Sequence, residues 1–143
     1  MEIRPITPRY SVAPQLTAGD MPAVAAAGFG TVICNRPDSE VTPDLQSDAI
    51  RAAAQAAGLR FEVLELDQQT LTPENARRQR ALIDGADGKV LAYCRSGTRC
   101  SVIWALGQLG DMPVDEILSR TAAAGYDLSG NRQAFEQMAR NRA

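Results

Sequence analysis

One stretch of the chain, residues 90–104, reads Val90-Leu91-Ala92-Tyr93-Cys94-Arg95-Ser96-Gly97-Thr98-Arg99-Cys100-Ser101-Val102-Ile103-Trp104. Its first four residues lack polar alternation, which is typical of a parallel strand buried on both faces. From Val102 onward, apolar residues recur at helical spacing. The six residues from Cys94 to Arg99 therefore form a loop between a buried strand and a helix N-terminus. Such a loop gathers N–H groups and partial positive charge, which favour anions and lower a thiol pKa. The stretch predicts a Cys94 thiolate in an anion-binding loop.

Strand and helix patterns alternate along the rest of the chain, which predicts an α/β fold with a mainly parallel sheet. The predicted strands are short extended pieces at Ile3 and 10–12, then 31–34, 61–66 and 90–93. Prolines at 5 and 8 favour an edge position for the first two pieces. The first predicted helix begins after Thr17 and ends at Ala27. Further helices are predicted over 42–57 and 72–83, from Val102 onward, and over 113–124 and 129–140. We predict one domain over residues 1–143, without repeats or linkers.

Three polar loops follow predicted strands, at 35–40, 67–70 and 94–99. Ligands of parallel sheets bind beyond the carboxyl ends of the strands. We therefore expect these three loops to meet at one site.

Composition narrows the function further. The chain has 143 residues, 45% of them hydrophobic, and a formal net charge of −2. These values predict a globular protein that does not bind nucleic acid. No apolar stretch is long enough for a membrane span, and the first residues lack the apolar region of a signal peptide. Three cysteines without such a signal indicate reduced thiols and a cytoplasmic location.

The sequence contains no histidine. This excludes Cys-His and Ser-His dyads, histidine zinc sites and histidine acid–base catalysis. We predict no metal and no cofactor. The nucleophile must then be activated by its electrostatic surroundings.

The residues around Cys94 have both functional and structural interpretations. Arg99 can bind two oxygens of an anion at once, whereas Arg95 is more typical of a rim position. Gly97 permits a tight turn. Three hydroxyl side chains can donate to a thiolate or ligand, although they are also ordinary turn and cap residues: Ser96, Thr98 and Ser101. Cys100 can act as a second reactive thiol, but simple packing in the core is the commoner role for a free cysteine, and Cys34 is expected in the core.

Charged residues on the other two loops complete the candidate site. Asp67 can serve as a general acid, or it can simply be a turn residue at the end of a strand. Arg36 and Asp38 can contact the substrate, or the charges at 36, 38 and 40 can pair with one another.

Taken together, these motifs resemble a known bacterial family. The resemblance covers most of residues 3–110 and depends on the joint presence of Asn35-Arg36-Pro37-Asp38 and Cys94-Arg95-Ser96-Gly97-Thr98-Arg99, together with Asp67 and Trp104. The family is the phosphatase-like domain of beta-lactamase hydrolase-like proteins, also described as sulfur transferases. It implies a fold similar to dual-specificity phosphatases, with a mostly parallel sheet between two helical layers.

Two departures separate this loop from that of cysteine phosphatases. Those enzymes carry histidine before the nucleophile and arginine six positions after it. Here Tyr93 and Cys100 hold these places, and the arginine comes one position early, at Arg99. This shorter spacing is similar to the rhodanese loop. A tighter ring of amides suits one sulfane sulfur better than a phosphate tetrahedron.

Three functions follow as expectations. The first is a rhodanese-type sulfurtransferase, in which Cys94 takes sulfur from thiosulfate or a persulfide. The second is a phosphatase that forms a phosphocysteine at Cys94, with Asp67 protonating the leaving group of a phosphate ester. The third is an anion-binding or redox-sensing module in which Cys94 and Cys100 form a reversible disulfide. The sequence does not predict the oligomeric state.

Overall fold

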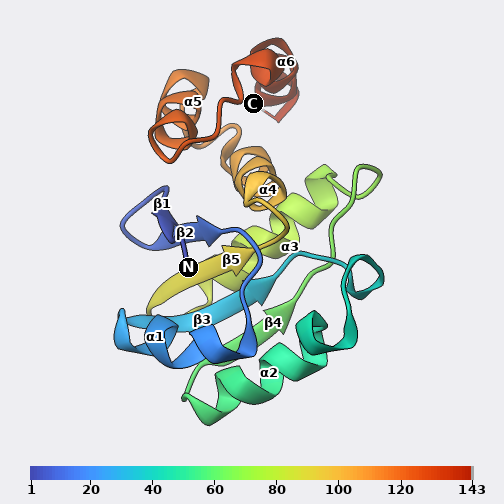
Figure 1. Cartoon of the computed structure of the whole chain (residues 1–143). Helices are drawn as coiled ribbons and strands as arrows, with labels where there is room; N and C mark the ends of the chain where they lie inside the picture. The colour runs from blue at the N-terminus through green and yellow to red at the C-terminus, as the bar shows by residue number, and fades with distance from the viewer. Residues whose placement is uncertain (143) are drawn as a thin grey trace.

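The computed structural model describes residues 1–142 as a five-stranded sheet with helices on both faces (Figure 1). The strands are β1 (Arg4–Pro5), β2 (Tyr10–Ala13), β3 (Phe29–Cys34), β4 (Arg60–Val63) and β5 (Lys89–Tyr93). The α-helices are α1 (Met21–Ala26), α2 (Ser47–Ala56), α3 (Pro73–Asp84), α4 (Thr98–Gln108), α5 (Val114–Ala123) and α6 (Arg132–Arg142). Short 3₁₀ helices lie at η1 (Ala18–Asp20), η2 (Asp38–Glu40), η3 (Pro43–Leu45) and η4 (Ser129–Asn131).

The strand order is β1-β2-β5-β3-β4, and only the β1–β2 pair is antiparallel. The α/β class and the mostly parallel sheet are therefore confirmed. The strand β5 lies in the middle, with Ala92 paired to Val12 on one side and to Ile33 on the other. The parallel register brings the carboxyl ends of β3, β4 and β5 to the same edge, where the three polar loops follow.

The central strand alternates between two hydrophobic cores. Val90, Ala92 and Cys94 face the core that includes residues of α3, α4, α5 and α6. Leu91 and Tyr93 face the opposite core, formed with α1 and α2. Figure 1 shows this arrangement, with α1 and α2 on one side of the sheet and α5 and α6 stacked beyond α4. The three-layer architecture is confirmed, and the alternation places the Cys94 side chain on the α3–α4 side.

Several predicted boundaries are wrong. The helix expected over 42–57 is divided, because Gln46 is extended (φ −71°, ψ 158°) between η3 and α2. The strand expected over 61–66 ends at Val63, although Leu64 and Leu66 still donate to backbone carbonyls of β3 and its loop. The edge position holds for β1 only, since β2 pairs with both β1 and β5. The helix expected from Val102 begins at Thr98, so the loop proper is shorter than predicted.

None of the helices within residues 1–142 is both long enough and apolar enough to span a bilayer.

Candidate active site

Cys94 lies directly after β5, and its loop turns into α4 through Gly97. Gly97 is the N-cap residue of α4 and has a φ of +93°, a conformation that side chains rarely adopt. Its N–H donates to the Cys94 Sγ at 3.1 Å. The Cys94 side chain is buried, with no exposed surface. The sequence stretch therefore folds so that backbone N–H groups surround a buried sulfur.

The Cys94 thiol has a strongly lowered pKa, from 9.0 to about 5. The largest cause is a hydrogen bond from the Cys100 thiol, and N–H groups of Cys100, Gly97 and Ser96 add to it. Burial opposes these effects but does not outweigh them. Cys94 is consequently a thiolate at neutral pH, which is the reactive form for a nucleophile.

The other two thiols remain protonated at neutral pH. Burial raises the pKa of Cys100 well above its ordinary value, and the neighbouring Cys94 raises it further. Burial also raises the pKa of Cys34. Cys34 is buried, as expected from its position at the end of a strand. At neutral pH, Cys94 is therefore a thiolate, whereas Cys34 and Cys100 are protonated thiols. The protonated Cys100 can donate a hydrogen bond to Cys94.

Arg99 is held by a carboxylate and by a backbone carbonyl. Its Nη1 and Nη2 donate to the two oxygens of Glu40 at 2.9 and 2.8 Å. Its Nη1 also donates to the Leu66 carbonyl at 2.8 Å. Arg36 Nε donates to the same Glu40 carboxylate at 3.2 Å, so two of the three charges at 36, 38 and 40 pair with each other. Glu40 therefore lies between two guanidinium groups, and Arg99 is the main cause of its lowered pKa.

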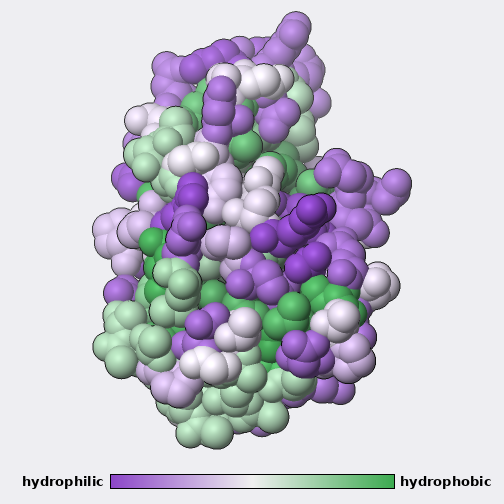
Figure 2. All heavy atoms as spheres, viewed as in Figure 1, coloured by the Kyte–Doolittle hydropathy of each residue, from purple (hydrophilic) through white to green (hydrophobic). Residues whose placement is uncertain are grey.

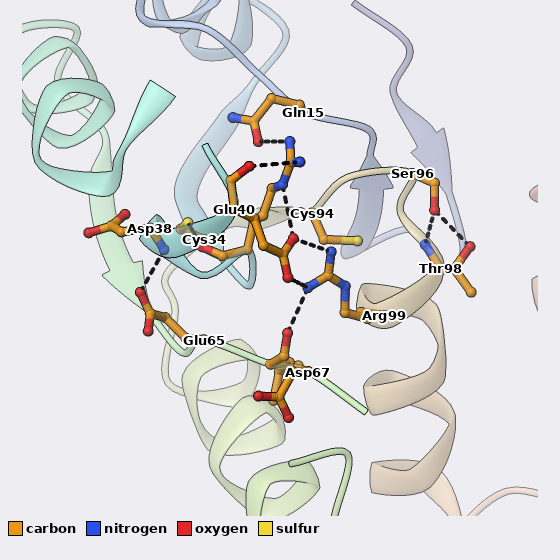
Figure 3. A network of polar contacts seen from close by, with 12 residues as sticks. Gln15, Cys34, Asp38, Glu40, Glu65, Asp67, Cys94, Ser96, Thr98 and Arg99 are labelled. Carbon is orange, nitrogen blue, oxygen red and sulfur yellow. Dashed lines mark hydrogen bonds and ion pairs between the residues drawn. The ribbon is translucent and has the colours of Figure 1, made fainter. Parts of the chain in front are cut away.

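The three polar loops meet around one cavity of about 440 Å³. Its walls are formed by Arg36, Glu40, Asp67, Gln68, Arg95 and Arg99. Figure 3 shows the Cys94 side chain beside Arg99, with Glu40 and Asp67 on neighbouring segments. In the space-filling view, hydrophilic side chains gather around the carboxyl ends of the strands (Figure 2). The cavity is polar, and its three arginines outnumber its two carboxylates, Glu40 and Asp67, so it suits a small anion.

The remaining predicted residues take other positions. Asp67 lines the cavity, but its Oδ1 accepts hydrogen bonds from the backbone of Gln69 and Thr70 and from the Thr70 hydroxyl. Asp38 lies outside the cavity lining, and its carboxylate accepts from the Ser47 N–H at 2.7 Å and the Ser47 hydroxyl at 3.1 Å, at the start of α2.

The three hydroxyl side chains of the loop bond to partners other than Cys94. The hydroxyls of Ser96 and Thr98 lie 2.9 Å from each other. The Ser101 hydroxyl donates to the Gly97 carbonyl at 2.8 Å. The side chain that contributes most to the low pKa of Cys94 is that of Cys100 instead.

A buried polar network supports the loop from the sheet side. The Tyr10 hydroxyl donates to the Cys100 carbonyl at 2.9 Å and accepts from Gln79 Nε2 at 3.3 Å. Gln79 and Asn35 exchange two further hydrogen bonds, each of 3.0 Å. The network runs from the loop after β3, through α3, to the first turn of α4. Sequence reasoning missed Gln79, because a glutamine among the arginines of α3 gives no sign of full burial.

Tyr126 is a second residue that sequence reasoning missed. It follows α5, yet its hydroxyl donates to the Ser96 carbonyl at 2.8 Å. It lies between the helices predicted over 113–124 and 129–140, where the sequence predicts no functional role. No local pattern marks a tyrosine that reaches 30 residues back along the chain to the Cys94 loop.

Within residues 1–142, no three side chains of the His, Cys, Asp and Glu types converge to form a metal site.

Known proteins share sequence similarity with most of this chain. Residues 2–111 match the family model of the "Beta-lactamase hydrolase-like protein, phosphatase-like domain". A beta-lactamase hydrolase-like protein of Xylella fastidiosa (strain Temecula1) is 31% identical over 130 residues, which are 90% of this chain and 30% of that protein. The chain thus spans about a third of the length of this relative.

Solved structures agree with the family match. The crystal structure of a candidate phosphatase from Neisseria meningitidis z2491 is 35% identical, with a TM-score of 0.86 over 96% of this chain and 99% of that one. The structure of P. aeruginosa TpbA in complex with pTyr is 15% identical, with a TM-score of 0.63 over 94% and 90% of the two chains, and shows a shared fold. This chain belongs to the phosphatase-like domain family of beta-lactamase hydrolase-like proteins.

Proposed function

We propose that this chain is a sulfurtransferase in which Cys94 carries sulfane sulfur as a persulfide. One observation carries the proposal: the donor to the Cys94 sulfur is the neutral N–H of Gly97, at 3.1 Å, and the neighbouring Cys100 thiol, with its raised pKa, is neutral as well. The loop's arginine, Arg99, is already bound to Glu40 and to the Leu66 carbonyl. Neutral donors that point at the sulfur of Cys94 can stabilise a single transferred sulfur atom there. A phosphoryl group has three further oxygens, each of which needs hydrogen-bond donors of its own.

The reaction divides into two displacements. The Cys94 thiolate attacks the outer sulfur of thiosulfate, the S–S bond breaks, and sulfite leaves with the electron pair. The outer sulfur remains on Cys94 as a persulfide, stabilised by the N–H groups of the loop. A second nucleophile, cyanide or a thiolate, then attacks that sulfur and regenerates the Cys94 thiolate. Arginines of the cavity attract the anionic donor in the first step and the anionic acceptor in the second.

Phosphate ester hydrolysis is the second candidate, and the comparisons favour it more directly. The family is described as phosphatase-like, and TpbA of the same fold was solved with pTyr. In this reaction Cys94 forms a phosphocysteine, Arg99 binds the transferred group and Asp67 protonates the leaving oxygen. Asp67 lines the cavity, which supports the role, although three hydrogen bonds hold one of its oxygens in a turn.

A paired assay tests both candidates. Thiosulfate–cyanide sulfur transfer and aryl phosphate hydrolysis are measured on the same samples of the wild type, Cys94→Ser and Asp67→Asn. The sulfurtransferase proposal expects thiocyanate formation that is lost in Cys94→Ser and unchanged in Asp67→Asn, with one added sulfur on Cys94 by intact mass. Phosphate release that needs both Cys94 and Asp67, without thiocyanate formation, would establish the phosphatase instead. Absence of both activities would overturn both and leave the anion-binding or redox module.

A further inference from the structure

The peptide group between Ser96 and Gly97 is held at both of its polar ends. Its N–H, from Gly97, donates to the Cys94 Sγ at 3.1 Å. Its carbonyl, from Ser96, accepts from the Tyr126 hydroxyl at 2.8 Å. The N–H and C=O of a trans peptide point in opposite directions. A bond that fixes the carbonyl outward therefore also fixes the N–H toward the sulfur.

This peptide needs such an anchor because glycine is one of its two residues. Gly97 has a φ of +93°, and glycine populates both signs of φ about equally. A rotated peptide would point the Ser96 carbonyl, a partial negative charge, at the Cys94 thiolate. The Tyr126 hydroxyl lies close against this position, since a Cβ on Gly97 would be 2.1 Å from its oxygen. Tyr126 thus supports the orientation with the donor toward the sulfur.

Tyr126 is itself fixed by contacts from both ends of the chain. Its N–H donates to the Thr121 carbonyl at 2.9 Å, and the Arg4 guanidinium lies 5.4 Å from the centre of its ring. Arg4 also donates to the Ala124 carbonyl at 3.4 Å. The side chain is buried, with 7% of its residue surface exposed. A buried ring under a guanidinium is a rigid support for a hydroxyl group.

We propose that Tyr126 is a positioning residue that orients the Ser96–Gly97 peptide and thereby stabilises the Cys94 thiolate. The active centre then extends beyond residue 111, where the family match ends. The inference rests on Cys94 being the reactive thiolate, as in the proposed function, but not on which group Cys94 transfers.

The test compares Tyr126→Phe with Tyr93→Phe in the full chain. Tyr126→Phe keeps the ring under Arg4 and removes only the hydroxyl. Tyr93→Phe is the matched control, because its hydroxyl is buried in the opposite core, where its neighbour is the Cys34 thiol and not the Ser96–Gly97 peptide. The readout is the ultraviolet absorbance of the Cys94 thiolate against pH, taken as the difference from the same protein with Cys94→Ser. Thermal unfolding of each sample confirms that the variant is folded.

We expect the Cys94 pKa to rise by about one unit in Tyr126→Phe and to stay within about 0.3 units in Tyr93→Phe. An unchanged pKa in Tyr126→Phe, beside a wild-type value of about 5, would overturn the positioning role. An ordinary pKa in the wild type would instead remove the thiolate on which the proposed function depends. The two failures are therefore distinguishable without any substrate.

Discussion

The guanidinium of Arg99 and the carboxylate of Glu40 form a two-bonded ion pair, at 2.9 and 2.8 Å, between residues 59 apart in sequence. The pair joins the first turn of α4 to the loop after β3 (Figure 3). It lies beside a Cys94 side chain that has no exposed surface. A donor molecule can reach the sulfur only after a neighbouring side chain moves. The pair holds Arg99 beside Cys94, and we expect its release to open the way to the sulfur.

Glu40→Gln should increase access to Cys94. A neutral amide binds a guanidinium more weakly than a carboxylate does, so Arg99 is released more often. Because the Cys94 pKa is about 5, the thiolate is formed at pH 7, and we use the rate of Cys94 alkylation there to report access. We expect iodoacetamide to label Cys94 several-fold faster, measured by intact mass. Glu65→Gln is the matched control, since Glu65 accepts from the Asp38 N–H and does not line the cavity. Slower labelling in Glu40→Gln would contradict a gating role.

Cys100 should tune Cys94 through its hydrogen bond rather than through its own reactivity. Cys100→Ala removes the largest cause of the low Cys94 pKa, and we expect that pKa to rise by about one unit or more. Cys100→Ser keeps a donor at the same position and should keep the pKa near 5. The measurement is thiolate absorbance against pH. Equal pKa values in the two variants would show that backbone N–H groups alone stabilise the thiolate.

Much of the site could be predicted from the sequence because its central part is local. The apolar run before Cys94 predicts the central strand, the turn with Gly97 predicts the change of direction, and Arg99 follows within one helical turn. Parallel strands bring their carboxyl ends together, which predicts the meeting of the three loops. The error in the start of α4 has a local reason as well: residues 98–101 are polar or small, so the apolar pattern begins one turn late.

The rest of the site depends on contacts between distant segments. Gln79 is fully buried only because Asn35 and Tyr10 face it across the core. Tyr126 reaches Ser96 only because of how α5 packs beyond α4. Asp38 had two candidate roles, contact with the substrate or pairing with the neighbouring charges, and it takes neither, because its carboxylate accepts from Ser47 at the start of α2. Such pairings leave no periodic signal in a single sequence.

Gly97→Ala should destabilise the protein for two reasons. A φ of +93° costs an L-residue about 1–2 kcal/mol, and the new Cβ would lie 2.1 Å from the Tyr126 oxygen. We expect the free energy of unfolding to fall by about 2 kcal/mol or more in a urea titration. Gly30→Ala is the control, because no atom lies within 4 Å of its Cβ position and its φ is not positive. A loss of similar size in Gly30→Ala would remove the local explanation.

The Cys94 thiolate should make stability depend on pH. The pKa is about 5 in the folded protein and 9.0 for an ordinary thiol. A lowered pKa contributes stability that is complete above pH 9 and is lost as the pH falls through 5. As the pH rises from 5 to 9, the wild type should therefore gain unfolding free energy relative to Cys94→Ser, by up to about 1.4 kcal/mol per pH unit. A difference that stays constant over this range would mean that the thiol titrates normally in the folded state.

Gln79→Leu should destabilise the fold and also raise the pKa of Cys94. Leucine fills a similar volume but leaves the Asn35 amide without the two hydrogen bonds that Gln79 supplies, which costs about 1–3 kcal/mol. The Tyr10 hydroxyl also loses a partner, and it holds the Cys100 carbonyl at the start of α4. Urea unfolding measures the first effect and thiolate absorbance the second. Gln55→Leu, on the exposed face of α2, is the control and should change stability by less than about 0.5 kcal/mol. A loss of stability with an unchanged Cys94 pKa would show that the network supports the core without acting on the thiolate.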